Sequence, residues 1–295
     1  MKLAVCVGIN DYPGTINDLN GCVNDANDWA WLLANEFEFN ETRVLLDSSA
    51  TKENILAELD WLVSSATEGD VVVFTYSGHG TQVSDENNDE EDFYDEALYV
   101  YDTYIIDDEL RSILDRLHPD ATAYLVIDSC FSGTSTRVMA FGQTPKPKFV
   151  QTHQVDRKVL RKNLLQEEEM TELLLTGSSD SEYAYDAYFG GKYNGAMTYF
   201  ALTTMYENLG ASWEDFYTKL RENLPSTSYP QTPQLEGKEE LKQRVLFEAT
   251  EVAPEPPTQP PDPPELPGDA CWILSFIREI LAWLVDVLDG FLHRR

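Results

Sequence analysis

The chain has 295 residues, of which 42% are hydrophobic, and this composition is typical of a globular protein with a substantial core. Its formal net charge is −31, so repulsion between like charges argues against general affinity for nucleic acids or anionic lipid surfaces. The four scattered cysteines form neither a disulfide framework nor a zinc-binding motif. The N-terminus enters a predicted strand without a secretory signal, and we therefore expect a cytoplasmic protein.

The apolar residues alternate between strand-like and helix-like patterns along the chain. Strands are expected at residues 3–9, 43–46, 71–76, 97–100, 121–127 and 172–177, and helices at residues 23–37, 52–65, 107–117, 196–208 and 213–223. The runs at 71–76 and 121–127 are short and rich in Val, Ile, Tyr and Thr, which is typical of buried strands in a parallel sheet. This succession predicts an α/β fold, with a mostly parallel sheet covered by helices on both faces.

Two potential catalytic groups follow two of these strands. His79 comes after the run at 71–76, in a turn that we expect Gly78 and Gly80 to make sharp, and Cys130 comes after the run at 121–127. Because reacting groups gather beyond the carboxyl ends of strands in α/β sheets, both side chains should lie on one rim. An imidazole that takes the proton of a thiol makes it a nucleophile, so the pattern predicts a Cys–His hydrolase. Backbone N–H groups in the regions around Gly78 and Cys130 would form an oxyanion hole. The expected donors are the N–H groups of Gly80 and Cys130.

Two later regions depart from the alternating pattern. Residues 134–166 hold seven of the 21 Lys and Arg residues and have the length of a functional or mobile loop. Residues 253–268 contain eight prolines in sixteen positions, which is typical of a semi-rigid linker, and residues 271–293 show a strongly amphipathic helical pattern. Charges within this last segment argue against a membrane span. We expect the helix to bind a partner protein or to self-associate; packing on the chain's own core and contact with a membrane surface are the alternatives.

The sequence resembles a known family at several separated motifs. Tyr76-Ser77-Gly78-His79-Gly80 and Asp128-Ser129-Cys130-Phe131-Ser132-Gly133 are similar to the His and Cys boxes of caspase-fold peptidases, most closely the metacaspases and their prokaryotic relatives, the orthocaspases. Five further stretches agree in order: Gly8–Tyr12, Leu19–Ala26, Asp89–Glu96, Ile106–Glu109 and Pro230–Leu235. The resemblance implies a caspase-like peptidase domain at residues 1–248, with a large-subunit-like part at 1–136, a basic cleavable loop at 137–166 and a small-subunit-like part at 167–248. A Pro-rich linker (249–269) and the amphipathic C-terminal helix (270–295) follow it.

The resemblance also implies a thiol protease that cleaves peptide bonds after Arg or Lys. In metacaspases the primary specificity pocket is lined by a Cys and an Asp of the first helix, a Ser beside the catalytic His and the Asp two residues before the nucleophile, which correspond here to Cys22, Asp25, Ser77 and Asp128. Two carboxylates in one pocket select a guanidinium or ammonium group. The expected partners are therefore proteins or peptides with exposed Arg or Lys. The alternatives are an Asp- or Asn-specific peptidase of the caspase clan, and a catalytically silent scaffold that associates through its C-terminal helix.

An enzyme with this specificity is able to cleave its own basic loop. We therefore predict a zymogen that matures by cleavage of this loop, either by itself or by an upstream activating peptidase. The candidate bonds follow Lys146, Lys148, Arg157, Lys158, Arg161 and Lys162. The alternative is a loop that stays uncut.

An acidic segment has the composition of a possible metal-binding site, although the predicted chemistry requires no cofactor. Residues 85–96 hold eight acids in twelve positions, and carboxylate oxygens suit Ca²⁺. Many metacaspases are activated by calcium through four Asp residues, and Asp95, Asp107 and Asp108 match three of them. Arg137, a cation that cannot bind a metal, stands at the fourth position. The sequence thus leaves two interpretations: a calcium site completed by Asp92 or Glu96, or a solvated acidic loop.

Overall fold

The structure, a computed structural model, describes residues 1–84, 94–130, 145–151, 167, 170–179 and 182–249. The chain divides into two compact units, Met1–Glu251 and Val252–Arg295. The predicted C-terminal helix and most of the Pro-rich linker lie outside the described residues. No helix in the part of the chain that the structure describes is long and apolar enough to cross a membrane.

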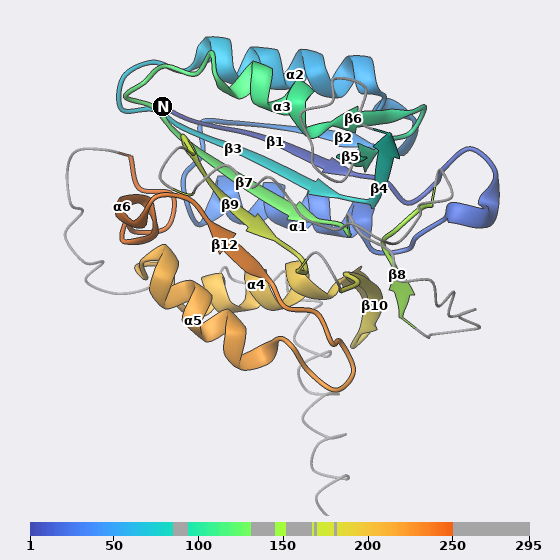
Figure 1. Ribbon diagram of the computed structural model, residues 1–295. Coiled ribbons are helices and arrows are strands. Elements are labelled where there is room, and N and C mark those ends of the chain that lie inside the picture. Colours follow the sequence, from blue (N-terminus) through green and yellow to red (C-terminus); the bar gives the residue numbers. More distant parts are fainter. Residues whose placement is uncertain (85–93, 131–144, 152–166, 168–169, 180–181, 250–295) are drawn as a thin grey trace, which may run out of the picture. The chain divides into compact units, whose positions relative to one another are not determined.

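A six-stranded sheet forms the centre of this unit (Figure 1). Its strands, in spatial order, are β12 (Gln234–Glu236), β9 (Glu172–Thr176), β7 (Thr122–Asp128), β3 (Val71–Ser77), β1 (Lys2–Gly8) and β2 (Glu41–Leu46). All neighbours are parallel except β12, which runs antiparallel to β9. The predicted mostly parallel sheet is therefore confirmed, with one short antiparallel strand at its edge.

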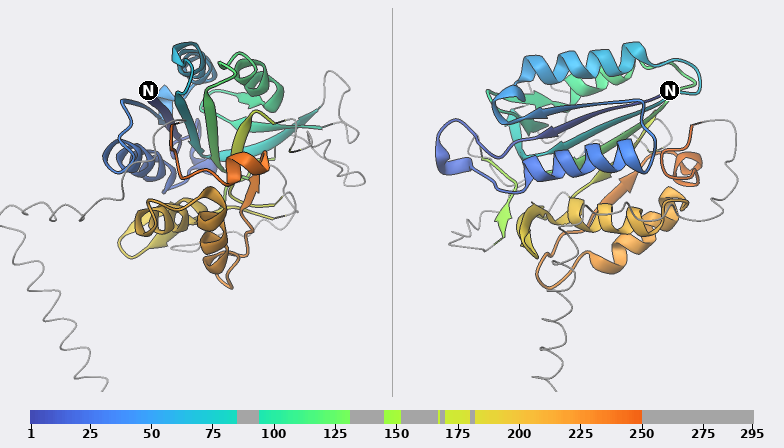
Figure 2. Two further views of the ribbon diagram at one scale, coloured as in Figure 1. Left: turned by 90° about the vertical axis from the view of Figure 1, so that its left-hand side faces the viewer. Right: turned by 180° about the vertical axis from the view of Figure 1, so that it is seen from behind.

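Helices cover both faces of the sheet, as expected (Figures 1 and 2). One face carries α2 (Lys52–Ser65) and α3 (Asp107–Leu114), and the other carries α1 (Cys22–Asn35), α4 (Ala196–Glu207) and α5 (Trp213–Asn223), with the short helix α6 (Glu239–Lys242) beside β9. Two of these helices begin at hydroxyl caps: the side chains of Thr51 and Ser212 accept backbone N–H groups of the first turns of α2 and α5.

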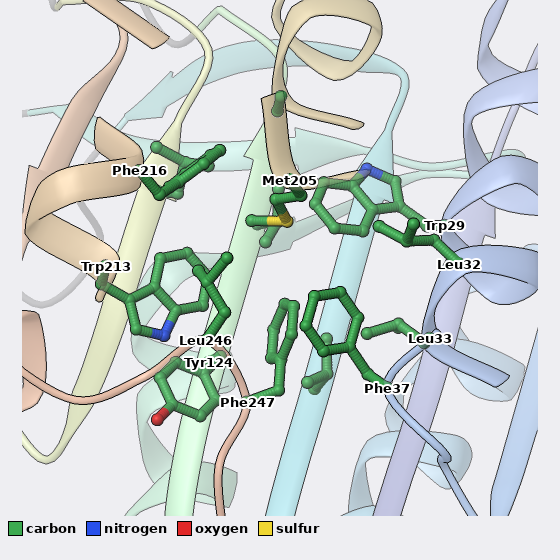
Figure 3. Packing of buried hydrophobic residues seen from close by; sticks show 14 of the residues in the cluster. Trp29, Leu32, Leu33, Phe37, Tyr124, Met205, Trp213, Phe216, Leu246 and Phe247 are labelled. Atoms are coloured by element: carbon green, nitrogen blue, oxygen red, sulfur yellow. The ribbon is translucent and has the colours of Figure 1, made fainter. Parts of the chain in front are cut away.

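Alternation along the central strands divides the buried side chains between two cores. In β3, Val72 and Phe74 face α2, whereas Val71 and Val73 face the larger core under α1, α4 and α5. Figure 3 shows the aromatic side chains of that larger core, in which the ring of Tyr124 stacks on Trp213 with a centroid distance of 5.0 Å. Because both faces are packed, the carboxyl ends of β3 and β7 are held in fixed positions.

Two small antiparallel sheets extend from the carboxyl ends of the strands. One contains β4 (His79–Ser84), β5 (Tyr94–Tyr99) and β6 (Tyr104–Ile106), and the other contains β11 (Lys192–Gly195), β10 (Tyr185–Phe189) and β8 (Lys146–Pro147). The chain bends at Gly78, between β3 and β4, as expected, whereas Gly80 takes no part in this bend because His79 and Gly80 already begin β4. Gly80 is needed for a different reason: a Cβ atom there would overlap with the backbone carbonyl of Cys130.

Candidate active site

The two predicted catalytic residues follow neighbouring strands. In the pairing of β3 with β7, Ser77 lies opposite Asp128 at the last position of each strand. His79 and Cys130 stand two residues beyond this pair, and all four side chains are buried. The sheet therefore brings both sequence motifs to one rim.

The imidazole of His79 is held by the loop that precedes α1. Its Nε2 lies 2.7 Å from the backbone carbonyl of Asn17, and its backbone N–H donates to the hydroxyl of Tyr12 (2.9 Å). A carbonyl only accepts hydrogen bonds, so Nε2 carries the proton and Nδ1 is left with a free lone pair. Nδ1 is buried and has no hydrogen-bond partner among the described residues. Burial lowers the pKa of His79 to about 4, so the ring is a neutral base at physiological pH.

The thiol of Cys130 is protonated in this arrangement. Its Sγ accepts the backbone N–H of Ala184 at 2.6 Å and lies 3.4 Å from the carbonyl of the same residue. Burial raises the pKa of Cys130 to about 12. The group becomes a nucleophile only when a base removes its proton.

A segment of the basic loop lies against these residues. Lys146 and Pro147 pair as strand β8 with β10, and the N–H of Lys148 donates to the carbonyl of Ala184 (2.9 Å). The carbonyl of Lys148 accepts two backbone N–H groups, from Gly80 at 3.0 Å and from Cys130 at 3.2 Å. Two N–H groups that converge on one carbonyl beside a thiol have the geometry that an oxyanion hole requires.

The side chain of Lys148 is fully buried in a pocket lined by carboxylates. Its Nζ lies 3.1 Å from Asp128 Oδ2 and 3.3 Å from Asp25 Oδ2, and it donates to the hydroxyl of Ser77 at 2.9 Å. Burial disfavours the charged ammonium, but the carboxylates outweigh it and raise the pKa of Lys148 well above its usual value. The thiol of Cys22 lies beside the ammonium of Lys148 and forms a hydrogen bond with Ser77. Burial raises the pKa of Cys22 well above its usual range. The four residues that the resemblance assigned to a specificity pocket thus surround one lysine.

Further hydrogen bonds fix the two carboxylates. Asp25 accepts the backbone N–H of Gly195 (2.9 and 3.0 Å) and the side-chain amide of Asn194 (2.9 Å). Asp128 accepts the backbone N–H and the hydroxyl of Thr198 at 3.1 and 2.7 Å. Burial raises the pKa of Asp25 to about 6, so this carboxyl takes up a proton at a higher pH than a free one.

Sequence reasoning did not identify Gly195, Asn194 or Thr198 as parts of this pocket. A Cβ atom at Gly195 would overlap with the carboxylate of Asp128 and the ammonium of Lys148, so the absence of a side chain there leaves room for the lysine. The only signal in the sequence was a glycine directly before the helix predicted at residues 196–208. This signal does not indicate a pocket.

The remaining predicted residues are only partly described. Of the candidate cleavage positions, Lys146 belongs to β8 and Lys148 fills the pocket between Asp25 and Asp128, whereas Arg157, Lys158, Arg161 and Lys162 lie outside the described residues. Asp107 and Asp108 begin α3, and Asp95 belongs to β5, on which α3 packs. Arg137 and Asp92 lie outside the described residues. Within the described ranges, no group of three His, Cys, Asp or Glu side chains is arranged to hold a metal ion.

Comparison with known proteins agrees with this geometry. Residues 2–139 match a family model described as the metacaspase, peptidase C14 domain. Metacaspase-1 of Candida albicans is 30% identical over 301 aligned positions, which cover 83% of this chain and 67% of the relative. Metacaspase-1A of Aspergillus fumigatus is 31% identical over 240 positions, which cover 68% of this chain and 58% of the relative, so the chain spans little more than half the length of that protein. A Geobacter sulfurreducens protein of known crystal structure superposes with a TM-score of 0.65 at 25% identity, covering 85% of this chain and 99% of that one.

The parallel sheet, the helices on both faces and the groups at the strand ends define the caspase-like fold. Within that fold the chain belongs to the metacaspase family of cysteine peptidases.

The pocket geometry predicts the effect of one added methyl group. In a Cys130→Ala background, the bond after buried Lys148 should resist trypsin, which must bind the lysine side chain itself. Gly195→Ala fills the pocket and should expel Lys148, so that trypsin cuts this bond at least tenfold faster. Gly210→Ala is the matched control, because a Cβ atom there meets nothing within 4 Å. Equal digestion of the two double variants, followed by mass spectrometry, would contradict the assignment of Gly195 to the pocket.

Proposed function

We propose that this chain is a cysteine endopeptidase that cleaves peptide bonds after Arg or Lys in protein substrates, and that it acts in the cytoplasm. One observation carries the proposal: Lys148 is buried between Asp25 and Asp128, while its carbonyl accepts N–H groups from Gly80 and Cys130. This is the pose expected of the residue that precedes a scissile bond.

The reaction follows from these contacts. The Sγ of Cys130 attacks the carbonyl carbon while its proton passes to Nδ1 of His79, whose ring is oriented by the Asn17 carbonyl. The N–H groups of Gly80 and Cys130 stabilise the negative oxygen of the tetrahedral intermediate. The imidazolium then protonates the leaving amine, and the C–N bond breaks to give a thioester. A water molecule, deprotonated by His79, hydrolyses the thioester and regenerates the thiol.

The charges of the pocket support basic specificity over the alternatives. A substrate Asp would add a third negative charge beside Asp25 and Asp128, and a neutral Asn would gain no ion pair there. A catalytically silent scaffold would have no use for a lysine carbonyl bound beside the thiol.

The same pose supports maturation at one particular bond. Of the two candidate positions that the structure describes, Lys148 fills the pocket with its side chain, whereas Lys146 donates to the backbone carbonyl of Asp18 at 2.9 Å. We propose that the uncut chain is a zymogen, because its own segment excludes other substrates, and that it cleaves the Lys148–Phe149 bond. An upstream peptidase is the alternative agent.

A panel of fluorogenic peptides tests the reaction. Peptides ending in Arg or Lys should be cleaved at least 100-fold faster than those ending in Asp or Asn, because of the charge of the pocket. Cys130→Ala and His79→Ala should each lower kcat/KM by roughly 10³-fold or more, since each removes one member of the catalytic pair. Cleavage after Asp, or full activity of either variant, would refute the mechanism.

Self-processing tests the chosen bond. The wild-type protein should yield a fragment that begins at Phe149, as read by N-terminal sequencing, and Cys130→Ala should not. Lys148→Ala should abolish this cut, Lys148→Arg should keep it, and Lys146→Ala is the control that should leave it in place. A Lys148→Ala chain that is processed as fast as wild type would contradict the assignment.

Self-processing should also slow as the pH falls from 7 to 5. The pKa of Asp25 is raised to about 6, so Asp25 becomes neutral in this window and loses its attraction for Lys148. His79 stays neutral, because its pKa is lowered to about 4. For wild type, we expect the rate of self-processing to fall by up to about tenfold, because the ionised fraction of Asp25 falls by about this factor between pH 7 and pH 5. Asp25→Asn, slower overall, should show no step near pH 6; identical profiles would contradict this role of Asp25.

Calcium activation through Asp95, Asp107 and Asp108 stays a prediction. The starting observation is that α3, which begins with two of these residues, packs on β5, which holds the third. The peptide panel with and without Ca²⁺, on wild type and Asp108→Asn, tests it. Equal rates with and without Ca²⁺ would exclude it.

A further inference from the structure

The docked segment continues past Lys148 and remains hydrogen-bonded to Gly80 of β4. Phe149 forms a parallel bridge with Gly80, and the N–H of Val150 donates to the carbonyl of Gly80 at 3.0 Å. Gly80 also donates its own N–H to the carbonyl of Lys148 at 3.0 Å. In a parallel pair, one residue bonds in this way to the residues before and after its partner. The segment thus makes one isolated parallel bridge to β4.

These two bonds lie on opposite sides of the proposed scissile bond. The carbonyl that would be attacked belongs to Lys148, and the second anchor is an N–H two residues further along the chain. Gly80 is buried, and the backbone of Cys130 leaves no room for a side chain there. Gly80 therefore contacts only the backbone of the bound segment. Any sequence with a backbone N–H at the second position after the scissile bond can make this hydrogen bond.

We propose that this site recognises its substrates beyond the scissile bond, through a hydrogen bond in which the second residue after the cut donates its backbone N–H to the carbonyl of Gly80. This inference rests on the proposed peptidase function. It defines a substrate class: extended polypeptide segments with a residue other than proline at that position, because proline has no N–H. Small amides that end directly after the basic residue lack this anchor.

The expected cost of losing the anchor is moderate. A substrate without the N–H leaves the buried carbonyl of Gly80 without this partner, and an unpaired buried acceptor costs more than a single exposed hydrogen bond. We expect kcat/KM to fall by about tenfold or more, whereas the preference for Arg or Lys before the cut should be unchanged, because the pocket around Asp25 and Asp128 is not affected.

A pair of peptide esters isolates this single N–H. The parent peptide carries the sequence Pro145–Gln151 of the chain, and in the test peptide the amide N–H of Val150 is replaced by an ester oxygen, which removes the donor without adding bulk. The control places the same ester at Gln151, whose N–H does not bond to Gly80. We expect at least a tenfold loss of kcat/KM for the test peptide and less than a twofold change for the control. The peptides are assayed on the self-processed protein, in which the chain's own segment is cut. Equal cleavage of all three overturns this inference alone; no cleavage of the parent overturns the proposed function and this inference with it.

The full chain gives a second readout. Val150→Pro keeps Lys148 but lacks the N–H, and proline restricts Phe149 to the extended backbone that it already adopts. Self-processing after Lys148 should slow at least tenfold in Val150→Pro and stay at the wild-type rate in Val150→Ala. Circular dichroism confirms that both variants fold. Equal rates for the two variants would overturn the inference.

Discussion

The ion cluster of Lys148 with Asp25 and Asp128 is the interaction on which the rest of the site depends. All three groups are removed from water, and buried charges are tolerated only when they are paired and hydrogen-bonded. Two carboxylates this close repel each other, so the pocket is complete only with a cation between them. The chain supplies that cation from its own basic loop, and the pairing places the backbone of Lys148 against the thiol and the imidazole.

The fold provides the carboxylates from two separate elements. Asp25 comes from the first turn of α1 and Asp128 from the end of β7, and they meet because both elements border the carboxyl end of the sheet. The N-terminal end of α4 closes the pocket: Gly195 leaves space and donates to one carboxylate, and Thr198 donates to the other. Oriented donors at a helix start favour negative charge there, which lets both acids stay buried. The pocket around Lys148 is thus formed by the same packing that closes the two cores.

The sequence predicted the parts of the site that follow directly from strand patterns. The runs before His79 and Cys130 have the composition of buried parallel strands, so their shared rim was predictable, and the resemblance supplied the carboxylates. The sequence could not predict the role of Gly195 in the pocket, because the need for glycine there follows only from the positions of the atoms that a side chain would overlap. Nor could it predict that Lys148 fills the pocket, since this depends on pairing between β8 and β10, two short strands without a hydrophobic pattern.

The covalent tether of the docked segment has a kinetic consequence. Because Lys148 is part of the same chain, it meets the pocket at an effective concentration on the order of millimolar, set by the loop and not by the amount of protein present. A free polypeptide at micromolar concentration therefore competes poorly for the pocket with the segment that holds Lys148, because that segment is tethered to it. Dilution does not relieve such a block, and crowding does not strengthen it. If the bond after Lys148 is cut within the same molecule, as proposed, the time that passes before this cut does not depend on the protein concentration.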